Sequence, residues 1–351
     1  MDARRLSLLE GARELGCDSL VACTPENMFY MTGFWGEGMA VLDGDHATIV
    51  APGLEAGRAE ADSRDCTIVS AGRGAEMVPA VARLLEGAKP CTDCADYSTM
   101  LLLQKHMPHV RHAPGPFQDS RMVKDAEEIR TLQEASRIID GMFELCAGTI
   151  TPGQTESQLQ AVLMSHAAER EMFDTGYPST LNPLIVAGGP NGALPHAQVT
   201  GRRFGRGDLV VVDITLRYRG YVSDATRTFG VGHVSPERVK IYEIVREAQE
   251  LGLRAAIHGV SCGDVDRACR DHIESRGYGR YFIHSTGHGV GLEVHEQPAI
   301  SRSVDTILRR DMAVTVEPGI YVPGEAGVRI EDSIIVGQGS MHRYTRDLVV
   351  V

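Results

Sequence analysis

Two acidic residues interrupt an apolar predicted hairpin in the second half of the chain. Residues 208–216 and 221–229 both have the composition of buried strands, and they contain Asp213 and Asp224. A turn at residues 218–219 would place these two carboxylates directly opposite each other. Like charges at opposed positions destabilise a sheet, and unpaired buried charge costs still more. A bound cation is the simplest way to relieve both effects.

A second predicted hairpin repeats this pattern. Its strands, residues 312–317 and 327–336, contain Glu317 and Glu331, and a turn centred on Gly324 would place these two opposite each other. A β-bulge in either hairpin would shift the pairing. A single acidic residue in a strand usually lies on a solvated face, but two acidic pairs in apolar hairpins indicate a cation site.

Three histidines lie between the hairpins. His284, His288 and His295 fall within residues 284–296, which also contain three glycines. The first two histidines have the i,i+4 spacing of a helical zinc pair, but the glycines argue against a helix and allow close approach of another backbone or a ligand. The segment lacks the Gly-Lys-Ser/Thr sequence of a phosphate-binding loop. Histidines beside four carboxylates therefore favour a metal site.

The predicted ligand set, one imidazole with several carboxylates, is rich in oxygen. Such a set favours Mn²⁺ or Co²⁺ over a structural zinc site with thiolates. Four carboxylates carry more negative charge than one divalent ion balances. Two ions about 3.5–4 Å apart, bridged by shared carboxylates, would balance it and would activate water for hydrolysis. The residues alone thus predict a dinuclear metallohydrolase.

Two domains are predicted to position these residues, since 351 residues suit about two domains. Segment 112–119 contains two prolines and a glycine and breaks both the strand and the helix period, so we place a linker there. The predicted domains are residues 1–119, with alternating strands and helices, and residues 120–351, an α+β domain with helices on an antiparallel sheet. Hydrophobic spacing predicts helices over residues 4–15, 76–85, 125–146, 156–170, 238–258 and 263–275, a strand over 19–23, and a hairpin of 39–42 with 47–50.

Composition argues against several classes of protein. The 47 acidic residues outnumber the 35 Lys and Arg, and the net charge of -12 disfavours nucleic-acid binding. No apolar run approaches the ~18–20 residues that span a bilayer, and the amino terminus shows no signal-peptide core. Eight cysteines form no dense disulfide framework, so we expect a cytoplasmic protein. Cys91 and Cys94 have C-x-x-C spacing without a second pair, and we interpret them as loop thiols.

The histidine segment 284–296 resembles the signature of the prolidase and aminopeptidase P type of metallopeptidase family M24. Other blocks of that family are matched at residues 28–34, 193–196, 213–228, 317–321 and 327–332. The resemblance runs along the whole chain. It implies a pita-bread catalytic domain, preceded by a smaller α/β domain of the creatinase or prolidase amino-terminal type.

The resemblance implies five metal ligands. Asp224 and Glu331 would bridge both ions, Asp213 would hold one ion, and His288 with Glu317 would hold the other. Glu317 would also shuttle a proton.

Further residues resemble the family's substrate-binding and supporting groups. His196, His284 and His295 resemble histidines that bind substrate and stabilise the tetrahedral oxyanion. Arg329 resembles a partner that orients a ligating aspartate, and Tyr321 resembles a similar support.

The implied activity is hydrolysis of the Xaa-Pro bond at the amino terminus of dipeptides or short peptides. The implied partners are two divalent ions, Mn²⁺ first with Co²⁺ or Zn²⁺ as alternatives, a proline-containing substrate and a second copy of the chain, with no nucleic acid or membrane. Xaa-Pro dipeptidase and Xaa-Pro aminopeptidase share the motif set, so both activities stay open.

Other pita-bread proteins provide the competing interpretations. A methionine aminopeptidase shares the ligand pattern but lacks the front domain and the His295-Glu296 motif, a creatinase-like hydrolase works without the ligands, and non-catalytic interaction modules typically lose them. The sequence departs from the family at Thr215, where glycine is common, and at residues 310–312, where Gly-Met is common. Thr215 brings a hydroxyl and a methyl close to the predicted metals.

Overall fold

The computed structural model describes residues 3–177, 181–182 and 184–351. The chain divides into two compact units, Met1–Arg121 and Met122–Val351. No helix in the described ranges is both long and apolar enough to cross a bilayer.

The first unit is built around a six-stranded mixed sheet in the order β4-β3-β2-β1-β5-β6. The predicted hairpin is confirmed, since β2 and β3 are antiparallel and pair Asp43 with His46 across the turn. Cys91 lies in β5, so its interpretation as a loop thiol is wrong. The elements are α1 (Ala3–Glu14), β1 (Ser19–Ala22), α2 (Pro25–Thr32), β2 (Met39–Asp43), β3 (His46–Pro52), α3 (Ala56–Asp62), β4 (Cys66–Ala71), α4 (Val78–Leu84), β5 (Pro90–Thr92), α5 (Tyr97–His106) and β6 (Arg111–His112).

The predicted linker contains regular structure. Helix α6 spans Gly115–Met122, so the expectation that residues 112–119 interrupt both periods is wrong for most of that segment. Pro116 is the second residue of the helix, where its fixed φ suits the first turn and its missing N–H is not needed. A proline that starts a helix was therefore taken for one that breaks it.

The second unit contains a nine-stranded sheet and a separate two-stranded ribbon, β14 with β15. The main path of the large sheet runs β12-β11-β13-β16-β10-β9-β7, with β8 beside β9 and β17 beside β16. The strands of the second unit, ribbon included, are β7 (Met172–Asp174), β8 (Ile185–Gly188), β9 (Leu209–Tyr218), β10 (Tyr221–Gly230), β11 (Gly287–Gly289), β12 (Glu296–Ile300), β13 (Ala313–Val316), β14 (Gly319–Val322), β15 (Ala326–Arg329), β16 (Glu331–Ile335) and β17 (Gly339–Ser340).

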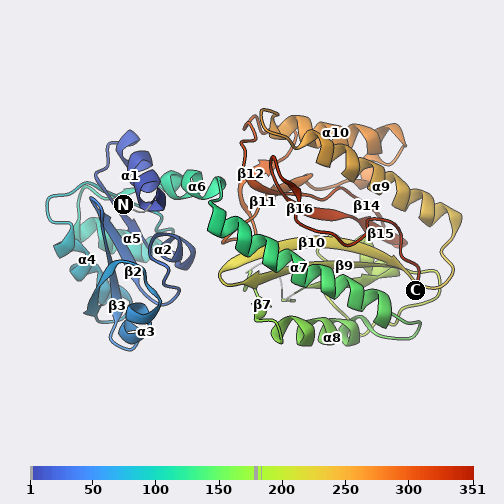
Figure 1. Cartoon of the computed structure of the whole chain (residues 1–351), viewed down its shortest axis with the longest axis horizontal. Helices are drawn as coiled ribbons and strands as arrows, with labels where there is room; N and C mark the ends of the chain where they lie inside the picture. Colours follow the sequence, from blue (N-terminus) through green and yellow to red (C-terminus); the bar gives the residue numbers. More distant parts are fainter. Residues whose placement is uncertain (1–2, 178–180, 183) are drawn as a thin grey trace. The chain divides into compact units, whose positions relative to one another are not determined.

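Four long helices cover this sheet in two pairs (Figure 1). They are α7 (Ala126–Thr149), α8 (Glu156–Ala168), α9 (Pro236–Ala255) and α10 (Cys262–Ser275), all close to their predicted ranges. Phe143 of α7 and Leu159 of α8 share one apolar core with β9 and β10. Tyr242 of α9 and Cys269 of α10 share another with β13, β14 and β15. The predicted arrangement of helices on a largely antiparallel sheet is confirmed.

The registers of the two hairpins differ in how well they were predicted. β9 and β10 turn at residues 219–220, both with positive φ, so Asp224 faces Thr215 and Asp213 faces Thr226. The predicted direct opposition of Asp213 and Asp224 is therefore wrong by two residues. An even shift keeps each side chain on its predicted face, because the side-chain period of a strand is two.

The second predicted hairpin is divided between two sheets. β13 pairs with β16, including Val316 with Asp332, and β14 pairs with β15, including Gly319 with Arg329. Both pairings keep the register predicted for a turn centred on Gly324. Glu317 lies between β13 and β14.

Candidate active site

The β9–β10 hairpin places Asp213 and Asp224 diagonally across one face of the sheet. The Thr215 hydroxyl lies between them, 2.8 Å from Oδ1 of Asp224 and 3.3 Å from Oδ1 of Asp213. Because the hydroxyl carries one proton, it donates to one of the two carboxylates at a time. Thr215, which stands where glycine is common in the family, thus contacts both carboxylates directly.

Strand β16 adds a third carboxylate and the buried Arg329 lies beside it. Thr226 pairs with Glu331 across β10 and β16, and its hydroxyl donates to Oε2 of Glu331 at 2.7 Å. Arg329 donates from Nε to that hydroxyl at 3.1 Å and from Nη2 to Oδ2 of Asp213 at 2.6 Å. Arg329 therefore contacts both Thr226 and Asp213 directly.

Glycine at position 287 brings His288 close to these carboxylates. A Cβ at Gly287 would collide with the backbone of Thr315 on β13, so only glycine lets β11 approach so closely. The backbone N–H of His288 donates to the Thr315 hydroxyl at 3.0 Å. Nδ1 of His288 lies 3.0 Å from the Gly289 carbonyl oxygen, which can only accept, so Nδ1 carries a proton.

The other ring nitrogen of His288 faces acidic groups. Nε2 lies 3.3 Å from Oε1 of Glu317 and 3.8 Å from Oδ2 of Asp224. Burial disfavours the charged imidazole, but these carboxylates outweigh it and raise the pKa of His288 to about 9. Burial likewise opposes ionisation of Glu317, yet His288 lowers the pKa of that carboxyl to about 2.

Two of the carboxylates lack such compensation. Burial, followed by repulsion from Asp213, raises the pKa of Asp224 to about 8. Burial, followed by repulsion from Asp224, raises the pKa of Glu331 well above its ordinary value. The protein alone therefore disfavours the ionised forms of both groups, and a bound cation would favour them.

The donor set fits divalent metal ions. Asp224, His288 and Glu331 each offer one ligand atom, and these atoms lie within 4.8 Å of one another. Asp213 and Glu317 border the same group through the contacts above. His288 bonds a backbone carbonyl through one nitrogen and aims the other at the carboxylates, as metal-binding histidines do. The structure thus brings all five predicted ligands together.

His284 is held by hydrogen bonds at both ring nitrogens. Nδ1 lies 2.7 Å from the Ser285 carbonyl oxygen, and Nε2 lies 2.9 Å from the Tyr321 hydroxyl. Burial lowers the pKa of His284, so the ring is neutral, with Nδ1 as donor and Nε2 as acceptor. The Tyr321 hydroxyl in turn accepts from Nη1 of Arg329 at 2.6 Å.

His295 and His196 lie at the exposed side of the cluster. The His295 ring stands 4.3 Å from that of His288, and its Nδ1 lies 3.1 Å from the Tyr177 hydroxyl. Burial and the charge of His288 lower the pKa of His295, so its ring is neutral at pH 7. His196 is exposed, and its charge contributes to the lowered pKa values of both His284 and His295.

Two residues of α10 that contact the histidine segment 284–296 were not identified from the sequence. Asp266 of α10 is fully buried and accepts from the Thr286 hydroxyl at 2.9 Å. Arg270, one turn later, pairs with Asp266 at 2.9 Å and donates to the His284 carbonyl oxygen. The Thr286 carbonyl accepts the Glu317 N–H at 2.8 Å. The i,i+4 Asp-Arg spacing on α10 was the available signal, but it also suits a surface pair.

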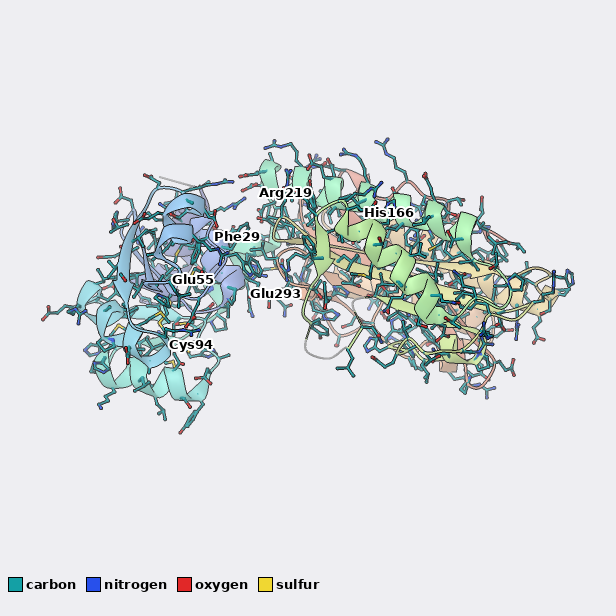
Figure 2. The ribbon with its side chains drawn as sticks, turned by 90° about the horizontal axis from the view of Figure 1, so that it is seen from below. Phe29, Glu55, Cys94, His166, Arg219 and Glu293 are labelled. Atoms are coloured by element: carbon teal, nitrogen blue, oxygen red, sulfur yellow. The ribbon has the colours of Figure 1, made fainter. Side chains whose placement is uncertain are left out.

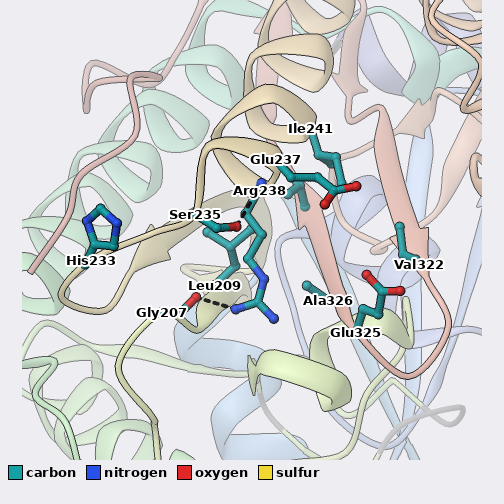
Figure 3. Close-up of a pocket in the computed structure, with 11 residues that line it drawn as sticks. Gly207, Leu209, His233, Ser235, Glu237, Arg238, Ile241, Val322, Glu325 and Ala326 are labelled. Atoms are coloured by element: carbon teal, nitrogen blue, oxygen red, sulfur yellow. Dashed lines mark hydrogen bonds between the residues drawn. The ribbon is translucent and has the colours of Figure 1, made fainter.

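A separate hollow of about 400 Å³ lies where the start of α9 meets the β14–β15 hairpin (Figure 3). Arg238 crosses it to donate to the Gly207 carbonyl oxygen, and Glu237 and Glu325 line it. None of the predicted site residues lines this hollow, so it is distinct from the carboxylate cluster.

Comparison with known proteins matches both units of the chain. The profile of metallopeptidase family M24 matches residues 130–338, and the creatinase/prolidase N-terminal domain matches residues 4–123. The chain belongs to metallopeptidase family M24. The predicted family and the pita-bread fold with a creatinase-type front domain are thereby confirmed.

Several members of this family are similar over the full length. An Xaa-Pro dipeptidase of Pyrococcus furiosus is 34% identical, with 99% of this chain and 98% of the relative covered. The solved Xaa-Pro dipeptidase from Bacillus anthracis has a TM-score of 0.91 at 32% identity, with 99% of both chains covered. The X-Pro aminopeptidase from Thermotoga maritima has a TM-score of 0.86 at 28% identity, covering 97% of this chain and all of that one (100%).

Proposed function

We propose that this M24 metallopeptidase hydrolyses the Xaa-Pro bond at the amino terminus of dipeptides or short peptides. The observation that carries the proposal is the convergence of Asp213, Asp224, His288, Glu317 and Glu331 on one face of the sheet. Full-length similarity to Xaa-Pro dipeptidases and to an X-Pro aminopeptidase supports the substrate class.

Two divalent ions, with Mn²⁺ as the proposed metal, would be held by these five residues. Asp224 and Glu331 would bridge the ions, Asp213 would complete one ligand set, and His288 with Glu317 would complete the other. When bound, the ions supply a nucleophilic hydroxide at neutral pH and polarise the scissile carbonyl. The raised pKa values of Asp224 and Glu331 support the bridging assignment, because a shared cation would favour the ionised forms of both groups.

The remaining groups bind substrate and move protons. A carboxylate oxygen of Glu317 takes the proton of the attacking water and passes it to the leaving proline nitrogen. His196 and His295, on the exposed side, contact the substrate and donate to the developing oxyanion. His284 has both ring nitrogens engaged, so we assign it a positioning role through Tyr321 and Arg329.

Preference for proline follows from the chemistry of its amide. An Xaa-Pro bond has no N–H, so a site shaped for it need not supply an acceptor. An ordinary peptide would bring an N–H that stays unpaired, at a cost of ~1–3 kcal/mol. The ring also fixes φ, which lowers the entropy lost when the substrate is oriented.

The test compares the Mn²⁺-loaded chain on Ala-Pro, Ala-Ala and Ala-Pro-Ala. We expect kcat/KM for Ala-Pro to exceed that for Ala-Ala by about 10- to 100-fold, as the penalty above implies. Equal values would contradict the proline assignment. The ratio of Ala-Pro to Ala-Pro-Ala separates dipeptidase from aminopeptidase. Exhaustive chelation should abolish all three activities, and full activity in a metal-free preparation would contradict the metal assignment.

We also propose a homodimer, as the family resemblance implies, and domain limits at residues 1–119 and 120–351. Light scattering of the purified chain tests the first. Limited proteolysis, with the cut sites mapped by mass spectrometry, tests the second.

A further inference from the structure

Two pairs of cysteines lie in or next to two neighbouring strands of the first unit, β1 and β5. β1 and β5 are parallel, with Leu20 level with Cys91 and Val21 level with Thr92. Continuing this register by two residues places Cys23, just after β1, level with Cys94, just after β5. Cys17, just before β1, contacts Cys91. The C-x-x-C spacing of Cys91 and Cys94 is therefore divided between two separate pairs.

Several contacts fix Cys23 beside Cys94. The Cys23 N–H donates to Oδ1 of Asp93 at 2.6 Å. The Thr92 hydroxyl lies 3.6 Å from Sγ of Cys23 and accepts the Cys94 N–H at 3.1 Å. The two thiols also interact electrostatically with each other. Neighbouring strands lie ~4.8 Å apart, within the 4.4–6.8 Å between Cα atoms that a disulfide spans.

The two pairs differ in access and in acidity. Cys23 is partly exposed, whereas Cys17, Cys91 and Cys94 are buried (Cys94 is labelled in Figure 2). The interaction between the two thiols lowers the pKa of Cys94 and, with burial, raises the pKa of Cys23 well above its ordinary value. Burial raises the pKa of Cys91 to about 12, so Cys91 is a thiol at neutral pH. Thiolate, not thiol, attacks disulfides, so attack by Cys23 requires that its proton pass to a neighbouring acceptor, and only the Cys23–Cys94 pair combines a partly exposed sulfur with such a neighbour.

We propose that Cys23 and Cys94 are a thiol–disulfide exchange site for low-molecular-weight disulfides. This site is independent of the metal cluster and of the proposed peptidase activity.

The exchange balances in two steps. The Cys23 sulfur attacks one sulfur of the external disulfide and gives its proton to Cys94, so that a mixed disulfide forms and one thiolate leaves. Cys94 then attacks Sγ of Cys23, its proton goes to solvent, and the second thiolate leaves. The two cysteines lose two electrons together, and the external disulfide is reduced to two thiols.

The test treats the full-length chain with glutathione disulfide and maps every cysteine by peptide mass spectrometry. We expect a cross-linked Cys23–Cys94 peptide, with Cys17 and Cys91 still reduced. The Cys94→Ser variant should retain glutathione on Cys23, because the second step is blocked. The Cys17→Ala variant is the matched control and should form the same cross-link as the unmodified chain.

Three outcomes would overturn the proposal. They are reduced Cys23 and Cys94 after treatment, a cross-link between Cys17 and Cys91 instead, and a glutathione adduct on Cys23 that persists in the unmodified chain. Cys66 is also partly exposed and is scored on its own peptide, so an adduct there does not enter the comparison. Mapping of the unmodified chain decides the question even if a variant fails to fold.

Discussion

Glu331 and Asp332 are adjacent on β16, both buried, yet their surroundings have opposite effects. Burial and neighbouring carboxylates raise the pKa of Glu331 well above its ordinary value. Burial also opposes ionisation of Asp332, but Arg227 and Arg346 outweigh it and lower the pKa to about 2. Successive residues of a strand point to opposite faces, so one strand serves two environments.

The charge of Asp332 is balanced by the protein itself. Arg227 donates to Oδ1 at 2.8 Å, Arg346 donates from Nε to Oδ2 at 2.8 Å, and the Ser340 hydroxyl donates to the same oxygen. No such set of cations surrounds Asp224 and Glu331 among the described residues, where Arg329 pairs with Asp213 instead. The charge of Asp332 is thus balanced within the protein, whereas for Asp224 and Glu331 we propose that bound metal supplies the balancing charge.

We call the side of the sheet that carries Asp224 and Glu331 the uncompensated face, and the side that carries Asp332 the compensated face. The Asp224→Asn variant tests the uncompensated face and should have the largest effect. A neutral amide is a poor bridge between two cations, so we expect bound metal to fall and kcat/KM to fall by about 10³-fold or more, or about 4 kcal/mol. The metal-free variant should be at least as stable as the unmodified metal-free chain, because a repulsive charge is removed. Metal analysis by mass spectrometry and denaturant unfolding measure the two effects. Retained metal with full activity would show that Asp224 is not a ligand.

The Asp332→Asn variant tests the compensated face. Removing one partner of a buried ion pair leaves charge unbalanced, so the free energy of unfolding should fall by about 3 kcal/mol. Metal content of the folded variant should stay unchanged. Glu243→Gln is the matched control, since Glu243 pairs with Arg246 at 2.7 Å but on the surface, where the loss should stay below about 1 kcal/mol. Equal losses in the two variants would remove the distinction between the faces.

This contrast explains what could be predicted from sequence. Helix α7 was predicted because its apolar residues recur with the helical period, and Asp213 and Asp224 stood out because strands are otherwise apolar around them. The register of their hairpin depends on the two-residue turn at 219–220, which the residue types left open. Asp332 was not identified, because its partners Arg227 and Arg346 come from distant segments. Long-range pairs of this kind leave no local pattern.

In the metal-free protein, the pH dependence of the free energy of unfolding should distinguish the two faces more sharply. Asp332 has a folded pKa of about 2 against an ordinary 3.8, so its stabilisation is present above about pH 4 and is lost as the pH falls toward 2. The stability advantage over Asp332→Asn should shrink by about 2 kcal/mol across that range. Asp224 has a folded pKa of about 8 against 3.8, so the unmodified chain should lose stability relative to Asp224→Asn as the pH rises from 4 toward 8.

Denaturant unfolding of the three proteins at a series of pH values between about 2 and 8 checks both slopes. If the free energy of unfolding of both variants changed with pH in parallel with that of the unmodified chain, the assignment of opposite environments would be contradicted.

The smallest effect is expected at Thr215, whose hydroxyl lies between Asp213 and Asp224 on the uncompensated face. A hydrogen bond to a carboxylate contributes about 1.5 kcal/mol, so the Thr215→Val variant should bind Mn²⁺ about tenfold more weakly. Thr215→Ser keeps the hydroxyl and removes only the methyl, and it should bind the metal as the unmodified chain does. Calorimetric titration of metal-free protein measures both affinities. If Thr215→Val binds Mn²⁺ as tightly as the unmodified chain, the hydroxyl does not support metal binding.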